Sequence, residues 1–318
     1  MIDFRYHIVS IVSIFLALAV GIVLGAGPLQ GEIGSTLTNE VAGLRKDKAQ
    51  LNDQLDTATK AAEARDGYLS AVSGRVLGDA LRDRSVAIVV LPGADAAVSE
   101  SVVESLGTAG ARLASTTSVT EDWVSTAQAT ASARDRAVAD VASQTGATTT
   151  SGSSEARDVL LATLLTRTAP AGDSGPDDTT ARTGLEALAD AGLISLDAPD
   201  FTRADLVVVV AGAVTDGEQA ARTRVAGSWV ALTVALDARS RGAVLAADLA
   251  SEKSGTSVIT TLRDTSSAVS EVSGVDDAAG PMGLASVVFA LVEQSGGKTG
   301  QYGLGPRVDA AFAPVPQS

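Results

Sequence analysis

The sequence predicts an α/β protein in three parts: an N-terminal transmembrane helix, a long coiled-coil helix and a Rossmann-like parallel-sheet domain with inserted helices. Three patterns predict it. An uncharged apolar run opens the chain, a heptad repeat follows, and short Val-, Ile- and Leu-rich runs then alternate with helical stretches. We expect an anchor over residues 1–27, a stalk over 31–80, a domain over 84–305 and a disordered tail over 306–318.

The composition excludes several classes of function. The 318 residues include 24 Lys and Arg against 38 Asp and Glu, a net charge of −14, and show no basic stripe, which argues against nucleic-acid binding. The chain has no Cys, so thiolate metal sites and thiol nucleophiles are excluded. Because His7 is the single histidine, histidine clusters are excluded as well. We therefore expect no cofactor and no metal site.

The first long apolar segment predicts a membrane anchor. Residues 8–26 carry no charge, and at about 1.5 Å per residue they can just cross a hydrocarbon core. A cleaved signal peptide is the alternative, but the run is longer than the usual ~15 residues and the head before it is barely basic. Arg5 precedes the run and Arg45 is the first basic residue after it, so we expect a cytoplasmic N-terminus in the cell membrane and an extracytoplasmic domain.

Small residues in the span and a heptad repeat beyond it predict self-association. A stripe of small side chains, at which two helices can approach closely, consists of Ala17, Gly21 and Gly25. Beyond the span, spacings of four and three residues alternate over more than five heptads. The apolar seam of this repeat includes Leu37, Val41, Leu44, Leu51, Leu55, Leu69 and Val72. Sustained 3.5-residue spacing predicts a parallel homodimer through stalk and anchor; the alternative is one amphipathic helix packed on its own domain.

The rest of the chain predicts a parallel sheet with helical crossovers. Apolar runs without polar alternation, typical of strands covered on both faces, follow Ser85, Asp205 and Gly242, with shorter candidates at Leu193 and Ala268. Helical spacing is present over 97–107, 121–141, 155–166, 217–239 and 282–294. The Ser-, Thr- and Gly-rich stretches that begin at residues 143 and 168 predict loops.

Three short motifs suggest chemistry that their context does not support. The GDSGP around Ser174 looks like a serine-protease nucleophile, but the only histidine lies across the membrane. The GGKT at Gly296 looks like the end of a phosphate loop but follows a helix. The acid pairs at 177–178 and 276–277 could contribute to cation sites, yet such pairs are usually turn or cap residues.

The ends of the predicted strands leave two possibilities open. Gly93 and Gly212 follow strands at the sheet edge where α/β proteins bind ligands, although turn geometry alone would account for them. An enzyme acting on envelope polymer would need two carboxylates in one cleft, and sequence does not place distant acids together.

Both ends of the chain resemble a known family. The opening Met1-Ile2 with Arg5 and His7, and a C-terminal pattern that contains Asp276, Gly283, Tyr302, Gly303 and Gly305, are similar to the actinobacterial MctB family of copper transport proteins. The resemblance implies envelope copper homeostasis, described as an outer-membrane channel in mycobacteria. A related member, SteB of corynebacteria, is implied in cell separation with a membrane partner, SteA. One helix cannot enclose a pore, so we expect a cell-membrane location.

Together these observations predict a single-pass envelope protein that is not an enzyme. The resemblance implies a role in copper transport or homeostasis, although no copper ligand can be carried over to this chain. The alternative is a dimeric coiled-coil scaffold that binds a division or cell-separation partner, such as a SteA-like membrane protein, without transporting metal.

Overall fold

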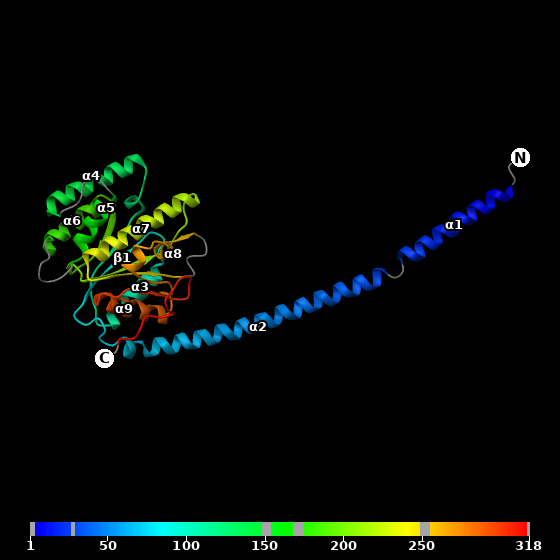
Figure 1. Ribbon diagram of the computed structural model, residues 1–318, viewed down its shortest axis with the longest axis horizontal. Helices are drawn as coiled ribbons and strands as arrows, with labels where there is room; N and C mark the ends of the chain where they lie inside the picture. The colour runs from blue at the N-terminus through cyan, green and yellow to red at the C-terminus, as the bar shows by residue number, and fades with distance from the viewer. Residues whose placement is uncertain (1–3, 27–28, 148–153, 168–174, 249–254, 317–318) are drawn as a thin grey trace. The chain divides into compact units, whose positions relative to one another are not determined.

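The structure is a computed structural model that describes residues 4–26, 29–147, 154–167, 175–248 and 255–316 (Figure 1). The chain divides into two units, residues 1–65 and residues 66–318, and each is described by itself. The first unit is entirely helical where it is described, whereas the second contains the sheet.

The first unit holds α1 (Phe4–Ala26) and most of α2 (Leu29–Leu77), a helix of 49 residues. Within α1, the 22 residues from Phe4 to Gly25 are long and apolar enough to cross a membrane. The stalk was predicted over residues 31–80, and α2 covers Leu29–Leu77. A long helix over the predicted stalk is therefore confirmed, and its pairing with a second copy stays a prediction.

The second unit is built on a seven-stranded sheet in the order β3-β2-β1-β4-β6-β8-β9. Every neighbouring pair is parallel except β2 with the edge strand β3. The strands are β1 (Ser85–Val90), β2 (Arg112–Val119), β3 (Ile194–Asp197), β4 (Leu206–Ala211), β6 (Ala243–Ala247), β8 (Ser273–Val275) and β9 (Gln301–Tyr302). The order confirms the predicted Rossmann-like arrangement.

Helices cover both faces of this sheet and bury β4 and β6 completely (Figure 1). One face packs against α4 (Gln128–Thr145), α5 (Ser154–Leu165), α6 (Asp178–Asp190), α7 (Gln219–Arg239) and α8 (Val258–Asp264). The other face packs against α3 (Ala96–Thr108), α9 (Pro281–Ser295) and the end of α2. A two-stranded ribbon of β5 (Ala213–Val214) and β7 (Thr256–Ser257) lies outside the main sheet.

The structure differs from the sequence prediction where polar sequence forms regular elements. Strand β2 was not predicted because its sequence is polar, and it buries the hydroxyls of Ser115 and Thr117. Helix α6 begins inside the stretch predicted as a loop from residue 168. The strand candidate at Ala268 begins as a short 3₁₀ helix, η3 (Ala268–Ser270), because only the sequence from Ser273 onward pairs with β6.

The prediction of a disordered tail is wrong for residues 306–316. The backbone N–H of Asp309 donates to the carbonyl oxygen of Gln301 at 2.7 Å, and Ala310 forms a bridge with Tyr302. Ala313 is buried and donates its N–H to the hydroxyl of Ser286 at 3.2 Å. The tail is ordered because it caps the free edge of β9, which would otherwise expose unpaired backbone groups.

The turns that follow β1 and β4 touch each other at two glycines. Gly93 has φ +82°, a left-handed conformation that favours glycine. A Cβ atom at Gly212 would collide with the carbonyl oxygen of Gly93. The two central strands can therefore leave the sheet side by side only because Gly212 has no side chain.

Replacement of Gly212 by Ala should lower the free energy of unfolding by about 1–3 kcal/mol, because a new side chain is forced against backbone that cannot retreat. Urea unfolding of the whole protein in detergent, followed by the fluorescence of the buried Trp123 and Trp229, measures it. Gly227→Ala is the matched control. No atom lies within 4 Å of the Cβ position there, in the middle of α7, so this variant should gain about 0.5–1 kcal/mol.

Candidate ligand crevice and the C-terminal motif

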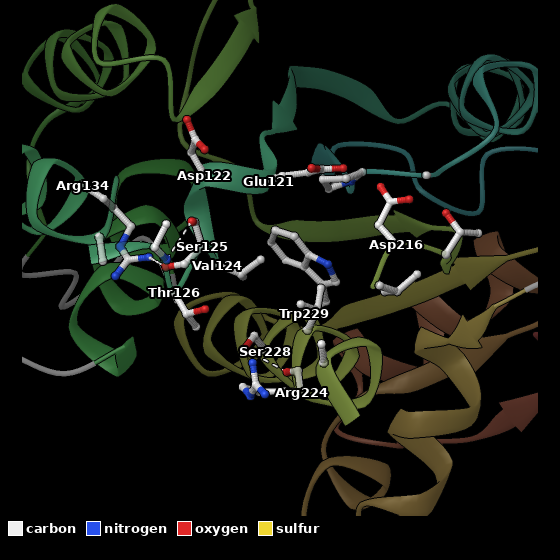
Figure 2. Close-up of a pocket in the computed structure, with 18 of the residues that line it drawn as sticks. Glu121, Asp122, Val124, Ser125, Thr126, Arg134, Asp216, Arg224, Ser228 and Trp229 are labelled. Atoms are coloured by element: carbon white, nitrogen blue, oxygen red, sulfur yellow. Dashed lines mark hydrogen bonds between the residues drawn. The ribbon is translucent and has the colours of Figure 1, made fainter. Parts of the chain in front are cut away.

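A crevice lies where the order of the strands reverses. From β1 the chain continues to β2 on one side of it, and later returns to β4 on the other side. Loops that leave such a pair of strands diverge, and open α/β sheets bind their ligands in the gap. Here the gap has a volume of about 770 Å³ and is lined by the loops after β1, β2 and β4 and by α4, α5 and α7 (Figure 2). This is the size of a small-molecule site.

The crevice is not built to hold a phosphate. A phosphate in such folds binds at the N-terminus of the helix after the first strand, where backbone N–H groups are unpaired. In this chain Asp95 takes that place, since its carboxylate accepts the N–H of Ala97 at 2.8 Å. The glycine turns at Gly93 and Gly212 close against each other, which confirms that turn geometry accounts for them.

Charged and hydroxyl side chains surround an apolar floor formed by the buried ring of Trp229. Figure 2 shows Glu121, Asp122 and Asp216 along one side of the crevice, with Arg224 and Ser228 on the other. The three carboxylates and the Arg224 guanidinium are all exposed. The crevice therefore presents both signs of charge to a ligand.

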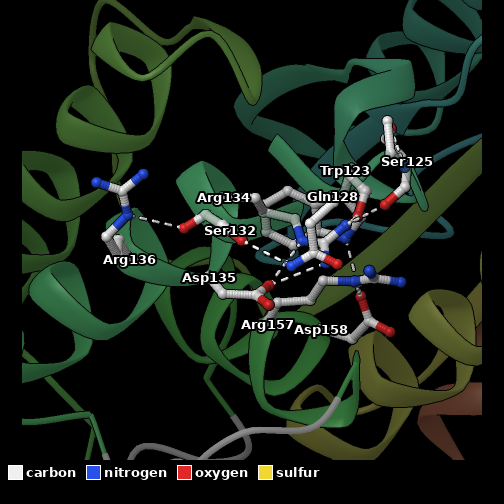
Figure 3. Close-up of polar contacts among 10 residues, drawn as sticks. Trp123, Ser125, Gln128, Ser132, Arg134, Asp135, Arg136, Arg157 and Asp158 are labelled. Atoms are coloured by element: carbon white, nitrogen blue, oxygen red, sulfur yellow. Dashed lines mark hydrogen bonds and ion pairs between the residues drawn. The ribbon is translucent and has the colours of Figure 1, made fainter. Parts of the chain in front are cut away.

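A buried polar network fixes the short 3₁₀ helix η1 (Glu121–Trp123), which carries two of these acids (Figure 3). The indole N–H of Trp123 donates to Asp158 at 2.8 Å. Arg134 donates to the carbonyl oxygens of Trp123 at 3.1 Å and Ser125 at 2.9 Å. Burial raises the pKa of Asp158, and the neighbouring Arg157 opposes that shift. The network ties η1 to α4 and α5 and so sets one wall of the crevice.

An enzyme acting on envelope polymer would need two carboxylates in one cleft, and the crevice meets this requirement only in part. Three carboxylates do share the crevice, yet each is exposed. A general acid in glycoside hydrolysis is usually a carboxylic acid held in an apolar pocket. Among the crevice-lining residues that the structure describes, no Asp or Glu is buried.

Two of the short motifs have structural roles. Asp177 caps α6 by accepting the N–H groups of Thr179 and Thr180, each at 2.9 Å, and the bond from Thr180 is the main cause of its lowered pKa. Gly296 and Gly297 end α9 and turn the chain toward β9. Ser174 of the protease-like motif lies outside the described residues.

The predicted anchor stripe lies open on α1. No atom lies within 4 Å of the Cβ positions of Gly21 or Gly25, and Ala17 is exposed as well. The stripe is therefore available for contact with a second helix.

The predicted seam of α2 falls into two parts. In the first unit its side chains are uncovered, with 59% to 68% exposure for Leu37, Leu44, Leu51 and Leu55, and 38% for Val41. Leu69 and Val72 belong to the second unit instead, where they line an apolar groove of about 240 Å³ with α9 and the C-terminal segment. The alternative of packing on the chain's own domain thus applies to the last turns of α2.

Asp276 of the C-terminal motif forms a buried clamp. Its side chain is fully buried and pairs with Arg263 at 2.5 Å. Its carboxylate also accepts the backbone N–H groups of Leu304 at 2.7 Å and Gly305 at 3.0 Å. Arg263 in turn donates to the carbonyl oxygen of Tyr302 at 3.0 Å. The clamp holds the loop after β9 against the end of β8.

The remaining motif residues have close contacts of their own, and one of them makes room for this clamp. Gly303 has φ +129°, and a Cβ atom there would collide with the Asp276 carboxylate. A Cβ atom at Gly283 would collide with the carbonyl oxygen of Asp277. The phenol of Tyr302 donates to Glu293, and burial together with that carboxylate raises its pKa. The motif therefore acts structurally.

Comparison with known proteins identifies the family. Residues 1–313 match the family model described as "Copper transport outer membrane protein, MctB". The chain belongs to the MctB family. It is 32% identical over 312 residues to "Copper transporter MctB" of Mycobacterium tuberculosis, which covers 96% of this chain and 97% of the relative. To the protein of the same name in Mycobacterium leprae it is 29% identical over 316 residues, with the same coverage.

The described side chains of this MctB family member do not form a copper site. Within the described residues, no three His, Cys, Asp or Glu lie close enough together to hold a metal ion. Copper prefers thiolate, thioether or imidazole ligands, and the chain offers no Cys. His7 lies in α1, and Met282 lines the apolar groove beside Phe289. The residues of the C-terminal motif thus fix the fold, and none of them is a soft ligand for copper.

Replacement of Asp276 by Asn should lower the free energy of unfolding by about 3–5 kcal/mol, because Arg263 is then left buried without a counter-charge. Urea unfolding in detergent measures the change. The matched control is Asp264→Asn, which breaks the pair of Asp264 with Arg307; both side chains are about half exposed, at 49% and 54%. The control should cost less than about 1 kcal/mol. Equal losses for the two variants would contradict the role assigned to the clamp.

Proposed function

We propose that this MctB family member is a single-pass membrane-anchored envelope protein with a non-catalytic role in copper homeostasis. The observation that carries the proposal is α1, an apolar helix of membrane-spanning length in a chain that matches the MctB family over residues 1–313. The charges around α1 favour a cytoplasmic N-terminus and an extracytoplasmic α/β domain.

The chemistry of the domain supports an indirect part in copper handling. One helix cannot surround an aqueous path, so passage of copper would need further helices from other chains. The described residues of the domain offer no soft metal ligands in a cluster. The domain would then act by binding a partner or a small molecule while another protein carries the ion.

Dimerisation through the stalk and the anchor is part of the proposal. Four leucines of the seam are more than half exposed along α2, although burial of such side chains is the main favourable contribution to helix pairing. The open stripe of Ala17, Gly21 and Gly25 on α1 would extend the same interface into the membrane. Both copies leave the same membrane face, so the pairing is parallel.

A dimeric scaffold that binds a cell-separation partner is the second candidate. Two observations favour it: the uncovered seam, and the lack of a metal cluster in the described residues. A membrane protein of the SteA type is the kind of partner it implies. In this case the protein would influence cell separation without affecting copper.

The double substitution Leu51→Asp and Leu55→Asp should convert the protein in detergent micelles from dimer to monomer, because it buries four unpaired charges in the seam. Multi-angle light scattering measures the mass of the protein part of the micelle. Gln50→Asp with Thr57→Asp is the control, since it adds the same charge outside the seam and should leave the dimer intact. A monomeric unmodified protein would refute the coiled-coil proposal.

Deletion of the gene should change the copper content of cells. The separation of daughter cells after division should stay normal. Metal analysis of washed cells and counts of unseparated cells by microscopy distinguish the two candidates. Restoration by the unmodified chain, and failure of restoration by the Leu51→Asp/Leu55→Asp variant, would tie the phenotype to the dimer. Unchanged copper content with chains of unseparated cells would favour the scaffold instead.

A further inference from the structure

The side chain of Arg157 lines the crevice, and only part of its guanidinium is hydrogen-bonded. Its side chain is only 7% exposed, and its Nε atom lies 3.2 Å from a carboxylate oxygen of Asp158 (Figure 3). Its two terminal nitrogens form no hydrogen bond or ion pair with any residue that the structure describes. Arg157 is one of the residues that line the crevice.

The neighbouring Arg134 shows how a structural arginine of this network differs. It is about as buried, and its nitrogens bond to Trp123, Ser125 and Asp135. The buried side-chain atoms that lack a partner among the described residues do not include the terminal nitrogens of Arg157, so these donors are open to solvent or to a ligand. The terminal edge of a guanidinium matches the two oxygens of a carboxylate. Arg157 is therefore suited to bind an organic anion.

Negative charge lines the same crevice. Glu121, Asp122 and Asp216 are exposed there and form no ion pair with any described residue. Arg224 adds one further positive charge across from them (Figure 2). Three carboxylates at the opening would repel a phosphate or a dicarboxylate but would attract an ammonium group. The crevice thus has an anion-binding interior and a cation-binding rim.

We propose that the crevice binds a small zwitterion, an amino acid or a short peptide, with its carboxylate on Arg157 and its ammonium against the acids of the rim. The volume of about 770 Å³ admits a molecule of several residues. The apolar floor at Trp229 and Val225 would cover the ligand's methyl groups or backbone. This site goes beyond the proposed role in copper homeostasis and does not depend on it.

Titration calorimetry of the full-length protein in detergent tests the site with three probes: trialanine, N-acetyl-trialanine and trialanine amide. Trialanine carries both charges, and each of the others lacks one. We expect saturable binding of trialanine and at least about tenfold weaker binding of both blocked peptides, since each loses one charge-assisted contact. A parallel change in tryptophan fluorescence is expected, because Trp229 forms the floor.

Substitutions test which residue binds the carboxylate of the ligand and which binds its ammonium group. Arg157→Lys keeps the charge beside Asp158 but loses the paired donors, so it should weaken trialanine about tenfold and leave the already weak binding of trialanine amide unchanged. Asp216→Asn should weaken trialanine while N-acetyl-trialanine is unaffected. Glu218→Gln, on the same loop but outside the crevice, is the control and should bind like the unmodified protein.

Folding of each variant is checked by its urea unfolding curve, and Arg224→Gln replaces Arg157→Lys if the latter is unfolded. Arg224 is exposed, and its guanidinium forms no ion pair with a described residue, so its loss should weaken trialanine without destabilising the domain. The proposal is overturned if trialanine fails to saturate by about 10 mM, a very weak affinity. It is also overturned if the three peptides bind equally, or if folded variants of both arginines bind trialanine unchanged.

Discussion

The contact between the turns after β1 and β4 is the constraint on which the α/β domain depends. Gly93 and Gly212 let the two central strands leave the sheet in touch with each other. The order of the strands reverses at this point, so the loops that follow diverge and leave the crevice between them. A side chain at Gly212 would separate the two turns and alter the crevice. One steric condition therefore controls both the centre of the sheet and the edge where the crevice lies.

The buried pair of Arg263 and Asp276 has the same role at the other end of the sheet. It fixes the loop after β9, and the segment beyond it then covers the sheet edge and reaches α9 and the last turns of α2. Gly303 is required because it leaves room for the carboxylate. Packing and charge thereby explain the residues of the C-terminal motif. The segment that follows the clamp packs beside the last turns of α2, so these residues have a structural role in the domain.

Sequence patterns revealed those elements whose physical cause is local. Strands β1, β4 and β6 were predicted because both of their faces are apolar, and Asp177 was anticipated as a cap or turn residue. Strand β2 was missed because burial by its neighbours, and not its own polar sequence, makes it a strand. The sequence indicated the sheet edge at which the crevice lies but not its charged lining, since topology alone brings Arg157 and Asp216 together. An arginine beside the apolar run of α5 was the one available signal for a buried charge.

We propose that this MctB family member takes part in copper homeostasis while its α/β domain leaves the ion uncoordinated. Its crevice is suited to a charged organic molecule, and the described residues provide no cluster of metal ligands. Competition of the full-length protein in detergent with a chromophoric copper(I) chelator tests this claim most directly. The chelator is expected to keep all of the copper. Stoichiometric retention of copper(I) that survives His7→Ala and is lost on Met282→Leu would contradict it.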